Sequence, residues 1–180
     1  MGAQDSKLFV ISGPSGAGKG TLVTRVRELR SNLGLTVSAT TRAPRKGEVD
    51  GVNYFFLTRE EFDRRVANGE FVEWAEVHGN CYGTLVSEVT SKLASGASLI
   101  LEIDVQGALQ VKERFPEAML IFIKPPSLEV LRERLVGRGT ETPETIELRM
   151  ANAADELALA DRYDDVVVND DLDRATDELV

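Results

Sequence analysis

The 180-residue sequence has little cysteine, little histidine and no long apolar run. Its one cysteine, Cys81, excludes an intramolecular disulfide framework and fits a reducing compartment, which favours the cytoplasm. Its one histidine, His78, has no evident partners for a catalytic triad, so a structural role is the simpler interpretation. No apolar stretch is long enough to cross a bilayer.

Positive charge is also scarce. The chain has 21 Lys and Arg against 30 Asp and Glu, and its formal net charge is −9. This balance argues against a general nucleic-acid binder and against a protein that docks on anionic membranes. We therefore expect neither partner, although a local basic cluster can still hold a nucleotide. A chain of this length predicts one domain with room for inserted subdomains.

The stretch 8–21 has the order of a strand, a glycine-rich turn and a helix. Residues 8–11 are apolar, and residues 13–19 have the G-x-x-x-x-G-K spacing of a phosphate-binding P-loop. Glycines let backbone N–H groups approach an anion, and the next helix adds its own N-terminal N–H groups. Lys19 can then reach the β- and γ-phosphates. The predicted ATP-binding residues of this loop are Gly13, Pro14, Ser15, Gly16, Ala17, Gly18, Lys19, Gly20 and Thr21.

The residue after Lys19 departs from the usual P-loop form. Ser or Thr normally follows the lysine and offers its hydroxyl to Mg²⁺. Here Gly20 follows, with Thr21 one place later. Direct ligation of the metal by a loop hydroxyl is thus left open, whereas phosphate binding is unaffected. The alternative interpretation is a glycine-rich connection between a strand and a helix, with a lysine on its surface.

Mainly apolar runs alternate with helical patterns along the chain. They cover residues 8–11, 98–103, 118–123 and 165–168. Such runs are typical of parallel strands buried on both faces, so we expect an α/β fold with a parallel-sheet core and helices on both sides. The stretch 35–84 differs, because its candidate strands are short, mixed in polarity and close together; they lie at 35–39, 54–57 and 71–77. We interpret this stretch as an insertion with antiparallel strands.

Motifs along nearly the whole chain resemble those of guanylate kinases. They are GPSGAGK at 13–19, SATTRAPR at 38–45, FVEWAEV at 71–77, GNCYGT at 79–84, IDVQG at 103–107, RGTE at 138–141 and VNDD at 168–171. The resemblance implies a nucleoside monophosphate kinase that transfers the γ-phosphoryl group of ATP to GMP or dGMP in purine nucleotide metabolism, with Mg²⁺ accompanying ATP. Gly20 stands where this family usually has Ser, and Cys81 stands where a second Tyr is common.

The resemblance also implies a division of the chain into three parts. Residues 1–34, 85–126 and 160–180 would form the P-loop core, residues 35–84 a mixed or antiparallel GMP-binding insertion, and residues 127–159 a helical lid with its flanking helices. The protein is expected to be a monomer or a homodimer.

Four residues of the insertion suit the phosphate of a nucleoside monophosphate. Arg42 and Arg45 offer two guanidinium forks, and Tyr54 and Tyr82 offer two hydroxyls. From composition alone they could equally be loop charges and aromatic residues at the edge of the core. The resemblance assigns all four to the phosphate of GMP.

Glu73 is the candidate that recognises guanine. Guanine presents N1–H and an exocyclic amine side by side, and one carboxylate can accept from both. The hydroxyls of Ser38 and Thr84 can donate to O6 or N7. The alternative is that Glu73 is an exposed position of an alternating strand, with Glu76 as a similar neighbour.

Three further candidate residues lie at the ends of expected buried strands. Glu102 and Asp104 end a strand beside the P-loop, where carboxylates organise Mg²⁺ or its water ligands. Asp104 could instead cap a helix, whereas the resemblance places it near GMP and metal-linked water. Asn169 resembles a residue on the adenine side of the ATP site, and it could also cap the last helix.

Arg134 and Arg138 lie four residues apart, and like charges at that spacing repel on a solvated helix. We expect an anion against them, with Arg149 joining from the next helix. In a lid, these three arginines would join Lys19 of the P-loop in neutralising the transferring phosphoryl group. The alternative is ion pairing with a nearby carboxylate, for which the candidates are Glu129, Glu133 and Glu141.

Two rival functions remain. An adenylate kinase is one, because residues 18–21 also resemble that family's loop, but the segment around Glu73 argues against it. The other is a non-catalytic guanylate-kinase-like scaffold module. Such modules typically lack the P-loop and the lid arginines that this chain has.

Overall fold

The computed structural model describes residues 6–77, 79–139 and 141–179, so His78 lies outside the described residues. Within them, the larger sheet is entirely parallel, with the strand order β2-β7-β1-β8-β9. The strands are β2 (Leu33–Leu35), β7 (Ser98–Glu102), β1 (Leu8–Ser12), β8 (Met119–Lys124) and β9 (Asp165–Val168). Their carboxyl ends meet at one edge, which is where ligands bind in open α/β sheets. The predicted fold class is confirmed.

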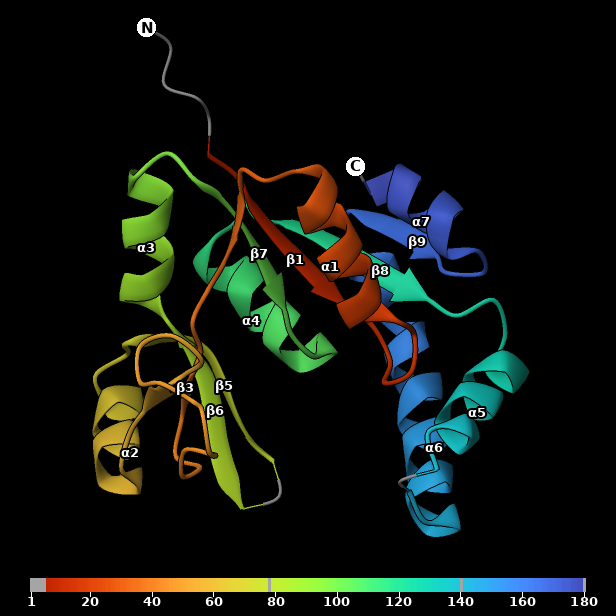
Figure 1. Cartoon of the computed structure of the whole chain (residues 1–180), viewed down its shortest axis with the longest axis horizontal. Coiled ribbons are helices and arrows are strands. Elements are labelled where there is room, and N and C mark those ends of the chain that lie inside the picture. The colour runs from red at the N-terminus through yellow and green to blue at the C-terminus, as the bar shows by residue number, and fades with distance from the viewer. Residues whose placement is uncertain (1–5, 78, 140, 180) are drawn as a thin grey trace, which may run out of the picture.

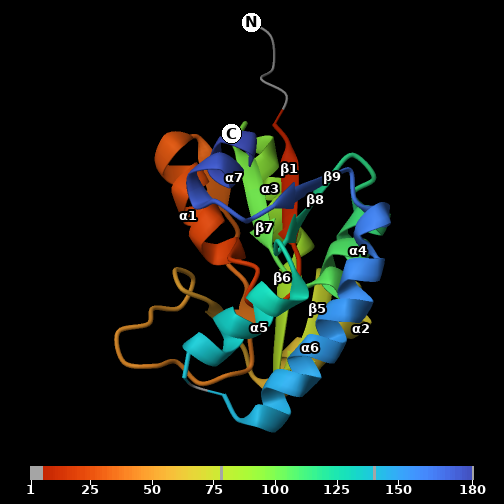
Figure 2. The same ribbon diagram turned by 90° about the vertical axis from the view of Figure 1, so that its right-hand side faces the viewer.

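Alternate residues of each central strand face opposite sides of this sheet. Val10 and Leu101 belong to one buried cluster, whereas Ile11 and Ile100 belong to the other. The first side is covered by α3 (Val86–Ala94) and α4 (Val105–Arg114), and the second by α1 (Lys19–Leu29) and α7 (Leu172–Leu179). Figure 2 shows α1 and α7 on one side of β1 and β8, with α4 on the other. This double burial fixes β1 and therefore the loop that follows it.

A second sheet has the strand order β4-β3-β6-β5. Its strands are β4 (Phe55–Phe56), β3 (Ala39–Thr40), β6 (Asn80–Leu85) and β5 (Phe71–Val77). The strand β6 is antiparallel to β3 and β5, whereas β3 and β4 are parallel. Helix α2 (Arg59–Ala67) packs on one face, where the ring centroids of Phe62 and Phe71 lie 4.5 Å apart. The sheet is mixed, as expected for the insertion.

The prediction of one strand at 35–39 is wrong. Leu35 is the last residue of β2, which pairs with β7, whereas Ala39 begins β3 of the second sheet. Residues 36–38 connect the two sheets. The parallel sheet thus extends one residue into the stretch that we interpreted as the insertion. Periodicity could not separate two strands of three and two residues.

Two further helices, α5 (Leu128–Gly137) and α6 (Pro143–Ala158), pack against each other. The residues buried between them are Leu131, Leu135, Ile146 and Ala153. In Figure 1 this helix pair, coloured cyan and blue, and the second sheet with α2 project from the same edge of the larger sheet. Among the described residues, the helices are too short or too polar to cross a bilayer.

Candidate functional site

The loop after β1 requires glycine at two positions, because other atoms occupy the space that a Cβ would need. Gly13 has φ +150°, and a Cβ there would lie 2.3 Å from the carbonyl oxygen of Ile123. Gly18 has φ +88°, and its Cβ would lie 2.4 Å from Nδ2 of Asn169. A side chain at either position would collide with these neighbours. The loop is therefore held tightly against the carboxyl ends of β8 and β9.

Lys19 folds back over this loop. Its Nζ donates to the carbonyl oxygen of Gly13 at 2.5 Å. Burial lowers the pKa of Lys19, and nearby carboxylates oppose that change. These carboxylates belong to Glu102, Glu156 and Asp104. The ammonium group is thus a largely desolvated cation that can exchange its carbonyl contact for phosphate oxygens.

Asn169 ties the loop to the end of β9. Its side chain is buried, and Nδ2 donates to the carbonyl oxygen of Ala17 at 2.8 Å. The backbone carbonyl oxygen of Asn169 accepts from Nη2 of Arg134, also at 2.8 Å. Asn169 does not cap α7; that role falls to Asp171, whose side chain accepts from the backbone N–H of Arg174 at 2.9 Å. Asn169 therefore supports the loop, and its contact with adenine stays a prediction.

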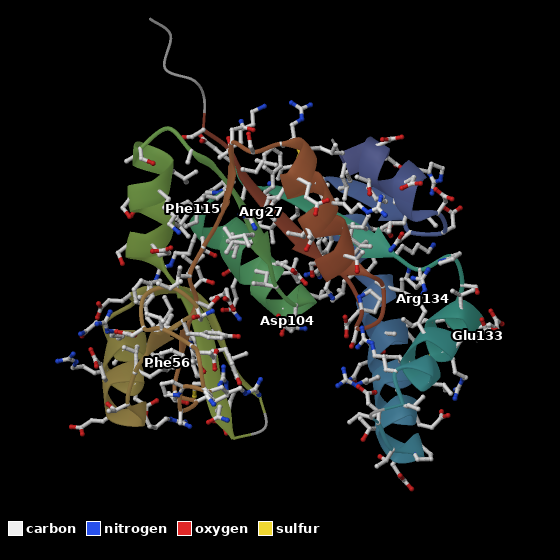
Figure 3. The ribbon with its side chains drawn as sticks, viewed as in Figure 1. Arg27, Phe56, Asp104, Phe115, Glu133 and Arg134 are labelled. Carbon is white, nitrogen blue, oxygen red and sulfur yellow. The ribbon has the colours of Figure 1, made fainter. Side chains whose placement is uncertain are left out.

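Two of the predicted lid arginines contact the loop directly. Nη1 of Arg134, from α5, donates to the backbone carbonyl oxygens of Gly16 and Ala17 in the loop, and its Nη2 donates to that of Asn169. Figure 3 shows Arg134 on the core side of α5 and Glu133 on the outer side. Arg149 of α6 donates to Oγ of Ser15 at 2.7 Å. Arg149 also forms an ion pair with Glu141 at 2.9 Å. Among the described residues, this is the only ion pair between a predicted lid arginine and one of the three candidate carboxylates, Glu129, Glu133 and Glu141.

Arg138 follows the end of α5 and differs from the other two. It is exposed; its backbone N–H donates to the carbonyl oxygen of Val136, but the described residues provide its side chain with no hydrogen-bond or ion-pair partner. It nevertheless lies near enough to Lys19 to lower the pKa of that lysine. Arg138 is therefore a cation available to a new anion near the P-loop.

The two predicted acidic residues lie at the carboxyl end of β7. Oε1 of Glu102 lies 3.5 Å from the place that a Cβ on Gly20 would take. Asp104 precedes α4, and its Oδ1 accepts from the backbone N–H of Gly107 at 2.7 Å. Asp104 thus caps a helix, as the alternative expected, and this bond occupies only one of its oxygens. Figure 3 places Asp104 at the edge of the core from which both units project.

Three of the four predicted phosphate-binding residues of the insertion come together. The guanidinium carbon of Arg42 lies 5.2 Å from the ring centroid of Tyr54, whose ring meets that of Tyr82 edge-on at 6.3 Å. Glu48 accepts from Nη1 and Nη2 of Arg42, both at 2.9 Å. These bonds raise the pKa of Arg42 and lower that of Glu48 to about 2. Arg45 lies on the same loop with an exposed side chain.

Glu73 is buried, although it lies next to an exposed tryptophan. Glu73 is 8% exposed and Trp74 is 40% exposed. The pairing of β5 with β6 is irregular between Phe71 and Glu73, which breaks the alternation of side chains. Phe71 therefore packs towards α2, whereas Glu73 turns to the other face and its Oε1 accepts from Oγ1 of Thr84 at 2.9 Å. The alternative of an exposed Glu73 is wrong.

The carboxyl group of Glu73 has an unusual proton affinity. Burial raises its pKa to about 7, the hydrogen bond from Thr84 acts against this rise, and Asp104 adds to it. A Cβ on Gly107 would lie 3.1 Å from both Oε2 of Glu73 and Oδ1 of Asp104. Both carboxylates therefore lie beside Gly107 at the start of α4. Through its charge, Asp104 also acts to raise the pKa of Lys19, against the lowering by burial. The same carboxylate therefore lies close to both the P-loop and the Glu73 site.

The remaining predicted residue and two unexpected ones complete the site. Ser38 lies on the connection between the sheets, where its carbonyl oxygen accepts from the backbone N–H of Phe55 at 2.9 Å. Sequence reasoning missed Glu156, which faces Lys19 from α6, and Glu48, which holds Arg42. The only sequence signal for Glu48 is an acidic residue in a basic loop. Glu156 had no signal, because its helix carries many carboxylates.

A glycine loop at the carboxyl edge of a parallel sheet, with a lysine and arginines around it, defines a nucleotide-phosphate-binding α/β protein. The arginine–tyrosine cluster on the second sheet adds a separate place for an anion. Phosphoryl transfer between two nucleotides requires such a pair of sites and charge neutralisation between them.

Comparisons with known proteins agree with this class. The guanylate kinase family model matches residues 5–180. The guanylate kinase of Gloeobacter violaceus is 58% identical over 96% of this chain and 84% of that protein, and that of Halalkalibacterium halodurans is 52% identical over 99% and 88%. The crystal structure of guanylate kinase from Anaplasma phagocytophilum aligns with a TM-score of 0.73, at 37% identity, over 98% of this chain and 83% of that one. The chain belongs to the guanylate kinase family.

Proposed function

We propose that this chain transfers the γ-phosphoryl group of ATP to GMP or dGMP, yielding ADP and GDP or dGDP. The observation that carries the proposal is the position of Asp104. Its charge acts to raise the pKa of both Lys19 in the P-loop and Glu73 in the insertion, so it lies near both. A donor and an acceptor nucleotide bound at these two places would have their phosphates close together. Membership of the guanylate kinase family supports the choice of substrates.

On the donor side, the proposed ATP site is the loop from Gly13 to Thr21, with Asn169 next to the adenine. Its glycines bring backbone N–H groups close to the phosphates, and α1 adds the positive end of its dipole. Lys19 would leave the carbonyl oxygen of Gly13 and bind the β- and γ-phosphates.

On the acceptor side, the proposed phosphate ligands are Arg42, Arg45, Tyr54 and Tyr82. Glu73 would accept from N1–H and the amine of guanine once it is ionised, while Thr84 and Ser38 donate to O6 or N7. Adenine carries no proton on N1, so it would leave the buried carboxylate poorly paired. A site of this kind rejects an analogue that leaves its polar groups unsatisfied.

Between the two nucleotides, Arg134, Arg138 and Arg149 would neutralise the charge of the transferring group. Phosphoryl transfer requires positioning and electrostatic stabilisation rather than a covalent nucleophile. Arg138 is the least engaged of the three, since it has no ion-pair partner among the described residues. Closure of α5 and α6 over the phosphates would also exclude water, which would otherwise accept the phosphoryl group.

The donor set suits Mg²⁺ held mainly by phosphates and water. Glu102 and Asp104 offer hard carboxylate oxygens, whereas Gly20 offers no hydroxyl. The described residues contain no group of three acidic, histidine or cysteine residues that could hold a metal by itself. We therefore assign Glu102 and Asp104 to the ion through its water ligands. When bound with ATP, the ion would neutralise part of the phosphate charge.

The cytoplasm is the proposed location, where the single buried thiol of Cys81 stays reduced. The function is tested by measuring ADP formation from ATP with GMP, dGMP, AMP or no acceptor. We expect turnover with GMP and dGMP and very little with AMP. A preference for AMP, or equal ADP formation without an acceptor, would overturn the proposal.

A further inference from the structure

The arginine that faces the proposed acceptor phosphate is already held by a carboxylate from its own loop. Arg42 and Glu48 lie six residues apart, and their side chains are only 14% and 17% exposed. Glu48 accepts from Nη1 through Oε1 and from Nη2 through Oε2, each at 2.9 Å. This parallel pair of charge-assisted bonds fixes the plane of the guanidinium group as well as its position.

The remaining donors of Arg42 follow from its chemistry. A guanidinium group carries five N–H bonds. Nη1 donates to Glu48 and also to the carbonyl oxygen of Ala43 at 3.0 Å, so both of its hydrogens are used. Nη2 gives one hydrogen to Glu48. Glu48 and Ala43 do not use Nε–H or the second hydrogen of Nη2, which lie parallel on the other edge and match two oxygens of one phosphate. Besides Glu48, the side chains of Tyr54 and Tyr82 also act on the guanidinium group as hydrogen-bond partners and raise its pKa.

Glu48 is itself fixed by the backbone and does not follow the arginine passively. Its Oε1 accepts from the backbone N–H of Arg45 at 2.7 Å, and its own N–H donates to the carbonyl oxygen of Arg45 at 3.0 Å. The ring of Tyr54 lies against the guanidinium group at 5.2 Å. The group is thus held along one edge by Glu48 and supported on one face by Tyr54.

We propose that Glu48 is a positioning residue that presents the Nε–Nη2 edge of Arg42 to the phosphate of the acceptor nucleotide. The inference rests on the proposed function, in which Arg42 binds that phosphate. A free arginine side chain has several flexible torsions, and ordering them on binding weakens affinity. Glu48 orders them beforehand, so its contribution should appear in acceptor binding and not in the chemical step.

A competing role for Glu48 is that of a stand-in for the phosphate, which the nucleotide must displace. The geometry disfavours this, because the carboxylate occupies the Nη1–Nη2 edge and leaves the Nε–Nη2 edge for a second anion. The two roles predict opposite results, since removing a competitor would tighten binding of GMP whereas removing a positioning residue would weaken it.

The test is Glu48→Gln, which keeps the size of the side chain and an oxygen for the backbone N–H of Arg45. Its NH₂ group would face Nη2 of Arg42 and break one arm of the pair. We expect the Kd for GMP by calorimetry to rise about tenfold, the loss of one charge-assisted bond. Binding of guanosine, which has no phosphate, should stay within about twofold. The KM for GMP should rise while kcat and the KM for ATP stay near wild type.

A double-mutant cycle with Arg42→Ala makes the test specific. If Glu48 acts through Arg42, Glu48→Gln should weaken GMP binding in the wild-type background and have almost no effect in the Arg42→Ala background. Glu76→Gln is the matched control, because Glu76 also pairs with an arginine, Arg59, at 3.1 Å on the same unit. We expect the control to bind GMP and guanosine like the wild type.

The outcomes separate the inference from the function on which it rests. Unchanged or tighter GMP binding by Glu48→Gln, beside a clear loss in Arg42→Ala, would overturn the role of Glu48 and leave the phosphate site intact. An equal loss for GMP and guanosine would mean that Glu48 only holds the loop, which also overturns the inference. Unchanged GMP binding in Arg42→Ala would instead contradict the proposed phosphate site and the inference with it.

Discussion

Ionisation of Glu73 should control how tightly the protein binds guanine. The carboxyl group is buried, accepts a hydrogen bond from Thr84 and has its pKa raised to about 7, mainly by burial. Only the ionised form can accept from both donors of guanine. Binding of guanine should therefore require loss of a proton wherever Glu73 is protonated beforehand.

The size of the effect follows from this pKa. A group with a pKa of about 7 is roughly 10% ionised at pH 6 and roughly 90% ionised at pH 8. The affinity for guanosine should therefore be about tenfold lower at pH 6 than at pH 8. Guanosine is preferable to GMP for this measurement, because the phosphate of a nucleotide itself titrates near pH 6.

The matched variant is Glu73→Gln, whose amide does not titrate in this range. Its NH₂ group would face the donors of guanine, so we expect a loss of about a hundredfold or more in catalytic efficiency with GMP. The affinity for ATP should be unchanged, and the preference for GMP over AMP should fall. Calorimetry between pH 6 and 8 should show no pH step for the variant.

Stability should change in the opposite direction to function. The pKa of Glu73 is higher in the native protein than its ordinary value of 4.5, so the native state binds more protons between about pH 4.5 and 7. The stabilisation from protonated Glu73 is thus complete below about pH 4.5 and is lost as the pH rises towards 7. At pH 8 the loss is on the order of 3 kcal/mol, and Glu73→Gln should be more stable than the wild type by a large part of it.

Two results would refute this reasoning. One is a flat pH profile of guanosine binding in the wild type between pH 6 and 8. The other is a Glu73→Gln variant with wild-type efficiency and selectivity for GMP, which would remove Glu73 as the residue that recognises guanine.

Three other substitutions test the phosphate side of the site. Lys19→Met should lower the rate of phosphoryl transfer about a hundredfold or more while circular dichroism shows the same fold, because the lysine stabilises charge in the transition state; near-wild-type turnover would contradict the assignment of the P-loop. Arg138→Ala should lower kcat at least about tenfold and leave calorimetric GMP binding nearly unchanged, because this exposed arginine would meet charge only after closure. Equal losses in both would place Arg138 in the acceptor site. Gly20→Ser should keep activity and retain or tighten the Mg²⁺ requirement in a magnesium titration, because a Cβ there lies 3.5 Å from Glu102, an ordinary contact. A collapse of activity would mean that the loop tolerates no side chain at this position.

The parallel sheet and the loop could be predicted from sequence because both depend on local patterns. The centre of a strand buried on both faces must be apolar, as residues 99–101 are in β7. A phosphate loop must have glycine wherever its neighbours leave no room, and Gly13 and Gly18 meet that condition. Helix caps are similarly local: Oγ1 of Thr58 accepts from the backbone N–H of Glu61, three residues later, at 3.1 Å.

The parts that could not be predicted depend on contacts between distant segments. The strand at 35–39 divided because its ends pair with different sheets, and no pattern within five residues records that. The direction of the Glu73 side chain depends on an irregular pairing with β6, which is absent from the alternation of β5 itself. Arg134 donates to the backbone carbonyl oxygen of Asn169, 35 residues away. The four-residue spacing of Arg134 and Arg138 predicted only an anion or a nearby carboxylate as partner.

The central claim is that the γ-phosphoryl group of ATP moves to GMP, and the fate of that group tests it most directly. The protein is incubated with ATP labelled at the γ-phosphate, Mg²⁺ and either GMP or AMP, and the labelled products are separated. We expect nearly all transferred label to appear in GDP, with little in ADP from AMP or in inorganic phosphate. Label that appears mainly in inorganic phosphate, or equally in both diphosphates, would contradict it.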